Sequence, residues 1–126
     1  METLLVQLAS ALVLLSQSLT NTAVASPEIY IRSQAPLYGI NPDVVVCIAK
    51  HESNFKEKAT GDKGQSRGTF QISRIWHPEV SDVAAYSLEA STAWTLTRLT
   101  QGFAYEWTTY RNDCSHLPVK IPVRLL

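Results

Sequence analysis

The sequence predicts a small, mainly α-helical domain with a short loop or strand segment between its two long helices. Asn41-Pro42-Asp43 is a strong helix start, because asparagine caps, proline fits the first helical position and an acid suits the first turn. Ser87 and Gly102 bracket a second periodic apolar stretch, Leu88 to Gln101. We therefore expect two long helices joined by a polar connection.

Length and charge limit the classes of function. A chain of 126 residues is long enough for one core but not for two. Eleven basic and eleven acidic residues give a net charge of zero, so nucleic acid is not an expected partner, because binding to phosphates needs a basic face. We expect a monomer.

The first 25 residues differ from the rest. Leu4 to Leu15 is apolar, about as long as the core of a secretory signal, and Ala23-Val24-Ala25 supplies a small-x-small cleavage pattern before Ser26. We therefore predict a signal peptide at 1–25, a single domain at 26–126, and export to the periplasm, the cell envelope or the medium. Only an uncleaved signal would bring membrane contact. Glu2 replaces the usual positive charge, so the alternative is an ordinary buried N-terminal helix.

The elements of the domain are predicted in order. Residues 27–37 should form a short helix that ends near Pro36 and Gly39. The helix that starts at Pro42 should run to about Asn54. Its expected shared face holds residues spaced by three and four, namely Val44, Ile48, His51, Glu52 and Phe55.

This face gives Glu52 a chemical meaning. Burial and the negative end of the helix dipole both disfavour the carboxylate, so both should raise the pKa of Glu52 and keep its proton available near neutral pH. A general acid for glycosidic cleavage needs this property. The alternative is a glutamate that extends from the helix end into solvent.

The middle of the chain is polar and rich in glycine. Ala59 to Gly68 should be a loop that can approach a ligand closely. Thr69 to Ile75 is ambiguous between a helical turn and a strand, and Trp76-His77-Pro78 ends it. Ser81 should cap one helical turn that reaches Tyr86.

The second long helix should bury one stripe, and an irregular tail should follow it. The expected stripe is Ala93, Leu96, Leu99 and Phe103. Among the aromatics that follow, Trp107 and Tyr110 are candidates for the core or, less simply, for the lining of a sugar site. The last ten residues contain two prolines and should wrap irregularly.

The two cysteines, Cys47 and Cys114, form the only pair that the sequence allows. In an oxidising compartment one disulfide would tie the helix of Glu52 to the C-terminal segment and would contribute about 3–4 kcal/mol on the loop-entropy model. The alternative is two free buried thiols.

Other chemistries fail on inspection. HESNF lacks the second histidine of a zinc protease, the three histidines have no ligand spacing, and no serine-nucleophile motif occurs, so we expect neither a metal nor a cofactor. Most glycosidases carry a second carboxylate. Asp62 is the best candidate, although a solvated side chain is the ordinary expectation for its turn.

Residues 49–73, AKHESNFKEKATGDKGQSRGTFQIS, resemble part of a known family. A Glu-Ser pair (Glu52-Ser53), a polar loop and then Ser66-x-Gly68-x-x-Gln71-Ile72 resemble the active-site region of soluble lytic transglycosylases, which belong to the lysozyme-like superfamily. The resemblance covers about 38–111. It implies a lysozyme-like helical fold, the glycan strands of peptidoglycan as substrate, and Glu52 as catalytic acid. By position it places Ser53, Ser66 and Gln71 among the substrate-binding residues.

The same stretch resembles animal-type lysozymes, which carry an aspartate five residues before the glutamine. Ser66 stands there instead. This difference favours cleavage between N-acetylmuramic acid and N-acetylglucosamine by a single glutamate, with closure of the muramic acid 6-hydroxyl to a 1,6-anhydro product. Interception by water would make the chain a hydrolytic muramidase. A third alternative is a peptidoglycan-binding module without catalysis.

The chain departs from the transglycosylase pattern in one further respect. The family's Ala-Tyr-Asn segment, whose tyrosine points at the acid, has no counterpart here. By position Tyr110 is expected to fill that place, and Trp107 to stack on a sugar face.

Overall fold

The computed structural model describes residues 26–122, so the predicted signal peptide lies outside the described residues. The mainly α-helical prediction is confirmed. In chain order the elements are α2 (Pro27–Gln34), η1 (Ala35–Tyr38), α3 (Pro42–Ser53), β1 (Thr60–Gly61), η2 (Asp62–Gly64), β2 (Ser66–Arg67), β3 (Ile72–Ser73), α4 (Asp82–Ala85), α5 (Leu88–Thr100), η3 (Ala104–Glu106) and η4 (Tyr110–Cys114).

The predicted helix starts are confirmed by their caps. Asn41 Oδ1 accepts the Asp43 N–H at 3.1 Å, and Ser87 Oγ accepts the Ala90 N–H at 3.1 Å. Ser81 caps α4 in the same way. At the other end of α3, Asn54 takes the left-handed conformation, with φ 52°, and stops the helix one residue before the predicted position.

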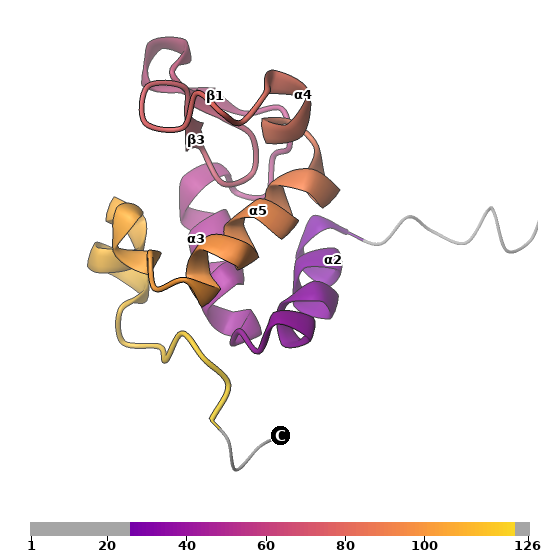
Figure 1. Ribbon diagram of the computed structural model, residues 1–126, viewed down its shortest axis with the longest axis vertical. Coiled ribbons are helices and arrows are strands. Elements are labelled where there is room, and N and C mark those ends of the chain that lie inside the picture. The colour runs from indigo at the N-terminus through magenta and orange to yellow at the C-terminus, as the bar shows by residue number, and fades with distance from the viewer. Residues whose placement is uncertain (1–25, 123–126) are drawn as a thin grey trace, which may run out of the picture.

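The three longer helices gather in one part of the molecule, and the sheet and α4 lie at its upper end (Figure 1). The chain between α3 and α4 forms a small antiparallel sheet in the order β1-β2-β3, with Arg67 opposite both Thr60 and Ile72. The ambiguous stretch 69–75 is therefore a tight turn followed by a strand, and the glycine-rich loop is largely folded.

The core lies between α2, α3 and α5. Its largest fully buried aliphatic side chains come from these helices and the turn before α3: Ile31, Ile40, Val44, Val45, Ile48, Leu96 and Leu99. On α3, the predicted stripe holds for Val44 and Ile48, whereas His51 is exposed and points away from the core.

The predicted stripe of α5 is wrong in half of its members. Leu96 and Leu99 are buried, but Ala93 is exposed and Phe103 is 41% exposed. The rest of the buried face is mostly hydroxyl-bearing, with Leu88, Ser91, Thr92 and Thr95 completing it. A pattern that counts only apolar letters misses threonine, whose methyl group packs well in a core. The buried hydroxyls of Thr92 and Thr95 have no hydrogen-bond partner among the described residues.

A disulfide joins Cys47 of α3 to Cys114 of η4, with 6.0 Å between the Cα atoms, which confirms the predicted pairing against two free thiols. The tail beyond η4 returns to the start of α3. The Asn41 N–H donates to the Val119 carbonyl at 2.8 Å, and the Ile121 N–H donates to the Gly39 carbonyl at 3.0 Å. The predicted irregular wrap is thus anchored by backbone hydrogen bonds. Every helix among residues 26–122 falls short of the length and apolar character that a membrane crossing requires.

Candidate active site

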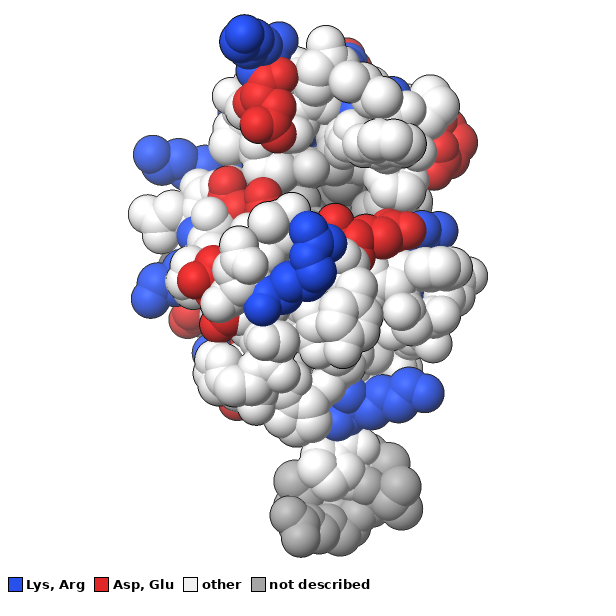
Figure 2. All heavy atoms as spheres, turned by 90° about the vertical axis from the view of Figure 1, so that its left-hand side faces the viewer, with Lys and Arg blue, Asp and Glu red and all other residues white. Residues whose placement is uncertain are grey.

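A cleft of about 920 Å³ lies between the sheet region and the segment formed by α5 and the turns after it. Glu52, Asp62, Ser66 and Gln71 line one part of it, and Trp76, His77, Trp94, Arg98, Glu106 and Trp107 line another. Basic side chains are scattered over the face drawn in Figure 2 and alternate with acidic ones, so the described residues form no continuous basic surface there.

Glu52 occupies the last turn of α3 and is half-buried in the cleft. Thr109 Oγ1 donates a hydrogen bond to Glu52 Oε1 at 2.7 Å. Burial raises the pKa of Glu52 above its ordinary value; the hydrogen bond from Thr109 opposes this effect, the charge of Asp62 adds to it, and His51 opposes it. The net result is a raised pKa, so the side chain is suited to hold a proton in the cleft.

Gln71 lines the cleft and also closes the loop beneath it. Its backbone is in the left-handed region, with φ 51°, and its Nε2 donates to the carbonyls of Gly68 at 2.9 Å and Ala59 at 3.2 Å. Gly61 lies close beside it: a Cβ there would lie 2.4 Å from Gln71 Oε1, so a larger residue at this position would displace the amide. The amide nitrogen is therefore used inside the protein, and the amide also fixes the shape of the loop.

Ser66 is hydrogen-bonded to Asp62. It is buried, and its hydroxyl donates to Asp62 Oδ2 at 2.5 Å. Asp62 is exposed at the opening of the cleft, so the cleft holds a second carboxyl group whose orientation Ser66 fixes. Asp62 is therefore solvent-exposed, as its turn leads one to expect, and is also restrained by the hydrogen bond from Ser66.

Of the remaining predicted site residues, one lines the cleft and two lie outside its lining. Trp107 lines the cleft with a buried ring, and its Nε1 donates to the Phe70 carbonyl at 3.1 Å. Ser53 lies outside the cleft lining and donates to the Thr69 carbonyl at 2.8 Å, which ties α3 to the sheet region. Tyr110 is also outside the lining, buried, and packed edge-on against Tyr105. Thr109, its neighbour, makes the contact with the acid that was expected of Tyr110.

Trp76 is a cleft residue that sequence reasoning missed. Its side chain is 79% exposed on the cleft wall. The turn that carries it is held because Ser73 Oγ accepts the backbone N–H groups of Ile75 at 3.1 Å and Trp76 at 3.2 Å. The sequence offers one signal for it, an aromatic residue five positions after Gln71, but the same residue begins the element break at Trp76-His77-Pro78.

A second missed group forms the wall beside Trp76. His77 Nδ1 lies 3.1 Å from Glu79 Oε1, and His77 Nε2 lies 3.4 Å from Glu106 Oε2. Its ring packs edge-on against Trp94 with 4.8 Å between centroids, and Arg98 pairs with Glu106. These residues come from the loop before α4, from α5 and from η3, so only the fold brings them together.

Arg67 holds the loop from which this wall is built. Its side chain is 2% exposed, and its Nη1 donates to the Val80 carbonyl at 2.7 Å and to Asp82 Oδ1 at 3.0 Å. Nε donates to the Ile72 carbonyl at 3.1 Å, and Nη2 lies within 3.5 Å of two more carbonyls, those of Ser73 and His77. A buried guanidinium thus fixes the path of the chain from β3 to α4.

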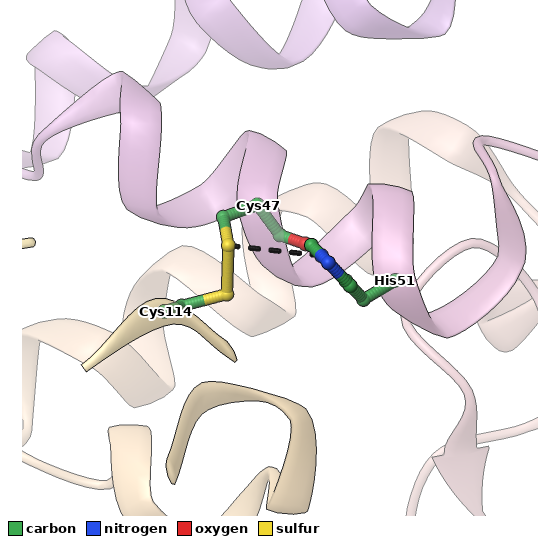
Figure 3. A group of neighbouring side chains, drawn as sticks. All are labelled: Cys47, His51 and Cys114. Carbon is green, nitrogen blue, oxygen red and sulfur yellow. Dashed lines mark hydrogen bonds between the residues drawn. A yellow bond between two sulfur atoms is a disulfide. The ribbon is translucent and has the colours of Figure 1, made fainter. Parts of the chain in front are cut away.

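One group of described side chains with metal-binding chemistry lies outside the cleft. It consists of Cys47, His51 and Cys114, two of which form the disulfide (Figure 3). No family model matches the chain, and no significant match appears among curated proteins or among solved structures.

Proposed function

We propose that this chain is an exported lysozyme-like enzyme that cleaves the β-1,4 bond between N-acetylmuramic acid and N-acetylglucosamine in peptidoglycan. The observation that carries the proposal is the half-buried carboxyl of Glu52, with a raised pKa, in a cleft of about 920 Å³ that Gln71 and Ser66 also line. The order of elements also supports a lysozyme-like fold, since the helix that carries the acid is followed by a small antiparallel sheet that borders the cleft.

In the proposed reaction, Glu52 first donates its proton to the glycosidic oxygen as the bond to the anomeric carbon breaks. The resulting carboxylate then accepts the proton of the muramic acid 6-hydroxyl, whose oxygen closes onto the anomeric carbon. Thr109 suits both steps of this reaction. Its hydroxyl donates a hydrogen bond to Glu52 Oε1 and so stabilises the carboxylate that forms after the first step and is consumed in the second. The disulfide supports export, since such bonds persist in oxidising compartments.

Hydrolysis is the second candidate, and Asp62 is the observation that favours it. A carboxylate held by Ser66 in the cleft can orient a water molecule toward the anomeric carbon, which is the role of the second acid in inverting glycosidases. Mass spectrometry of the released muropeptides separates the two candidates. Anhydro ends are one water lighter than hydrolysed ends, and an Asp62→Asn variant should lose the hydrolysed product only if Asp62 positions the water.

We expect Thr109→Val to shift the pH profile. The hydrogen bond from Thr109 lowers the pKa of Glu52, so its removal should raise that pKa further. Because the first step needs protonated Glu52, activity should then persist to higher pH, and the basic limb of kcat/KM should move upward. The limb is measured with a soluble glycan substrate across neutral and alkaline pH.

The matched control is Thr108→Val, since Thr108 also lines the cleft but its hydroxyl accepts from Arg111 rather than touching Glu52. This control should leave the basic limb in place. A basic limb that moves equally in both variants, or in neither, would remove Thr109 from the role proposed.

We expect Trp76→Ala to weaken substrate binding. An exposed indole on the cleft wall offers a flat apolar face on which a sugar ring can stack, and the loss of such a contact should raise KM about tenfold with little change in kcat. Trp76→Phe should recover most of the loss. Equal KM values for the alanine variant and the parent would show that Trp76 does not touch the glycan.

A further inference from the structure

A second group of reactive side chains lies where α3 meets η4, outside the cleft. Cys47 and His51 are one helical turn apart on α3, and Cys114 is the last residue of η4. The ligand atoms of the three residues all lie within 4.8 Å of one another (Figure 3). His51 is exposed, Cys47 is partly exposed and Cys114 is buried, so the group is open to solvent from the histidine side.

We propose that Cys47, His51 and Cys114 bind a zinc ion when their disulfide is reduced. Thiolates and imidazole are the ligands that zinc prefers in proteins, and two cysteines with one histidine leave a fourth position for water. A spacing of four residues puts Cys47 and His51 on the same side of α3, and Cys114 approaches from the opposite element.

One of the three separations between ligand atoms already matches a tetrahedral site. Zinc–sulfur bonds of about 2.3 Å and zinc–nitrogen bonds of about 2.0 Å require a sulfur–nitrogen separation of about 3.6 Å and a sulfur–sulfur separation of about 3.8 Å. The distance from Cys47 Sγ to His51 Nδ1 is already 3.7 Å. The two cysteine Cα atoms lie 6.0 Å apart, and once the disulfide is reduced, rotation of the two side chains can separate the sulfurs to the distance that a shared metal requires.

His51 can be released for this role. Its Nδ1 lies 2.9 Å from the Cys47 carbonyl oxygen, to which it can donate. That carbonyl also accepts the backbone N–H four residues later along α3, so it stays hydrogen-bonded if the ring turns to a metal. The ring then gives up one hydrogen bond and leaves no buried acceptor unsatisfied.

The disulfide and the metal exclude each other, because the same two sulfur atoms are needed for both. A phosphine reductant and water supply two electrons and two protons to the disulfide, which becomes two thiols while the phosphine becomes its oxide. Zinc then displaces a proton from each thiol. Every newly made chain passes through a dithiol form before the sulfur–sulfur bond exists, so the two cysteines are available as thiols at that stage. This inference does not depend on the proposed enzymatic activity.

The test is a cobalt(II) titration of the full chain, reduced with a phosphine under anaerobic conditions. We expect one equivalent of cobalt to produce thiolate-to-cobalt charge-transfer absorption, which zinc should then abolish by displacement. The oxidised chain should show no such absorption. A reduced chain that gives no charge-transfer absorption at micromolar cobalt would overturn the proposal.

Two histidine variants decide whether the folded site is responsible. His51→Ala should weaken cobalt binding at least tenfold, whereas His116→Ala, which changes an exposed histidine two residues after Cys114, should leave it unchanged. Equal cobalt affinity in the two variants, whether unchanged or equally reduced, would show that His51 is not a specific ligand and would overturn the site. Because both variants retain the two cysteines, far-ultraviolet circular dichroism of their oxidised forms checks that each still folds.

Discussion

The Glu52→Gln variant should cleave peptidoglycan about a thousandfold more slowly than the parent. Glutamine has the shape of a glutamic acid but cannot give a proton to the glycosidic oxygen, and its Oε1 can still accept the hydrogen bond from Thr109. Since burial raises the pKa of Glu52, an ionised carboxylate is disfavoured in the folded protein, and the neutral amide should not lower stability near neutral pH. The loss should therefore be catalytic.

The measurement is the rate of muropeptide release from purified sacculi, together with binding of the variant to the same sacculi. Glu89→Gln is the control, because Glu89 is an exposed acid in the first turn of α5, and its rate should equal that of the parent. A Glu52→Gln variant that releases products as fast as the parent would remove Glu52 as the acid. A parent that binds sacculi but releases nothing would leave the non-catalytic binding module as the function.

The parts of the site that could be predicted are those encoded by local sequence. Glu52 follows from an acid that continues an apolar stripe, and both long helices follow from capping residues that act on the next two or three amides. The disulfide follows from there being only two cysteines. In each case the information lies within a few positions or in a simple count.

The parts that could not be predicted depend on contacts between distant segments. Thr109 and Tyr110 are neighbours in sequence, and only the π-helical turn of η4 decides that the threonine reaches Glu52 while the tyrosine packs inward. Asp62 enters the cleft because a hydrogen bond from Ser66 and a left-handed backbone, with φ 48°, hold it there. No periodicity in the sequence reports these choices.

Arg67 is the residue whose environment differs most from its sequence context. A polar loop with three glycines indicates an exposed arginine, yet this guanidinium is buried and bonded to several carbonyls of the chain between β3 and α4. The same chain carries Trp76 and His77 into the cleft wall. Both the stability of the domain and the shape of the cleft wall therefore depend on the Arg67 side chain.

We expect Arg67→Met to lower the free energy of unfolding by about 4 kcal/mol, because methionine fills the space but leaves the buried carbonyls of Ile72 and Val80 without their donors. Urea titration measures this loss. The control is Arg74→Met, since Arg74 contacts the same Asp82 carboxylate but is 37% exposed, and this substitution should lower the free energy of unfolding by less than about 1 kcal/mol.

If both variants lost the same small amount of stability, the ion pair with Asp82 alone would explain the role of Arg67. A large loss confined to Arg67 would instead assign it to the buried carbonyls, and KM should then rise as the wall around Trp76 loosens.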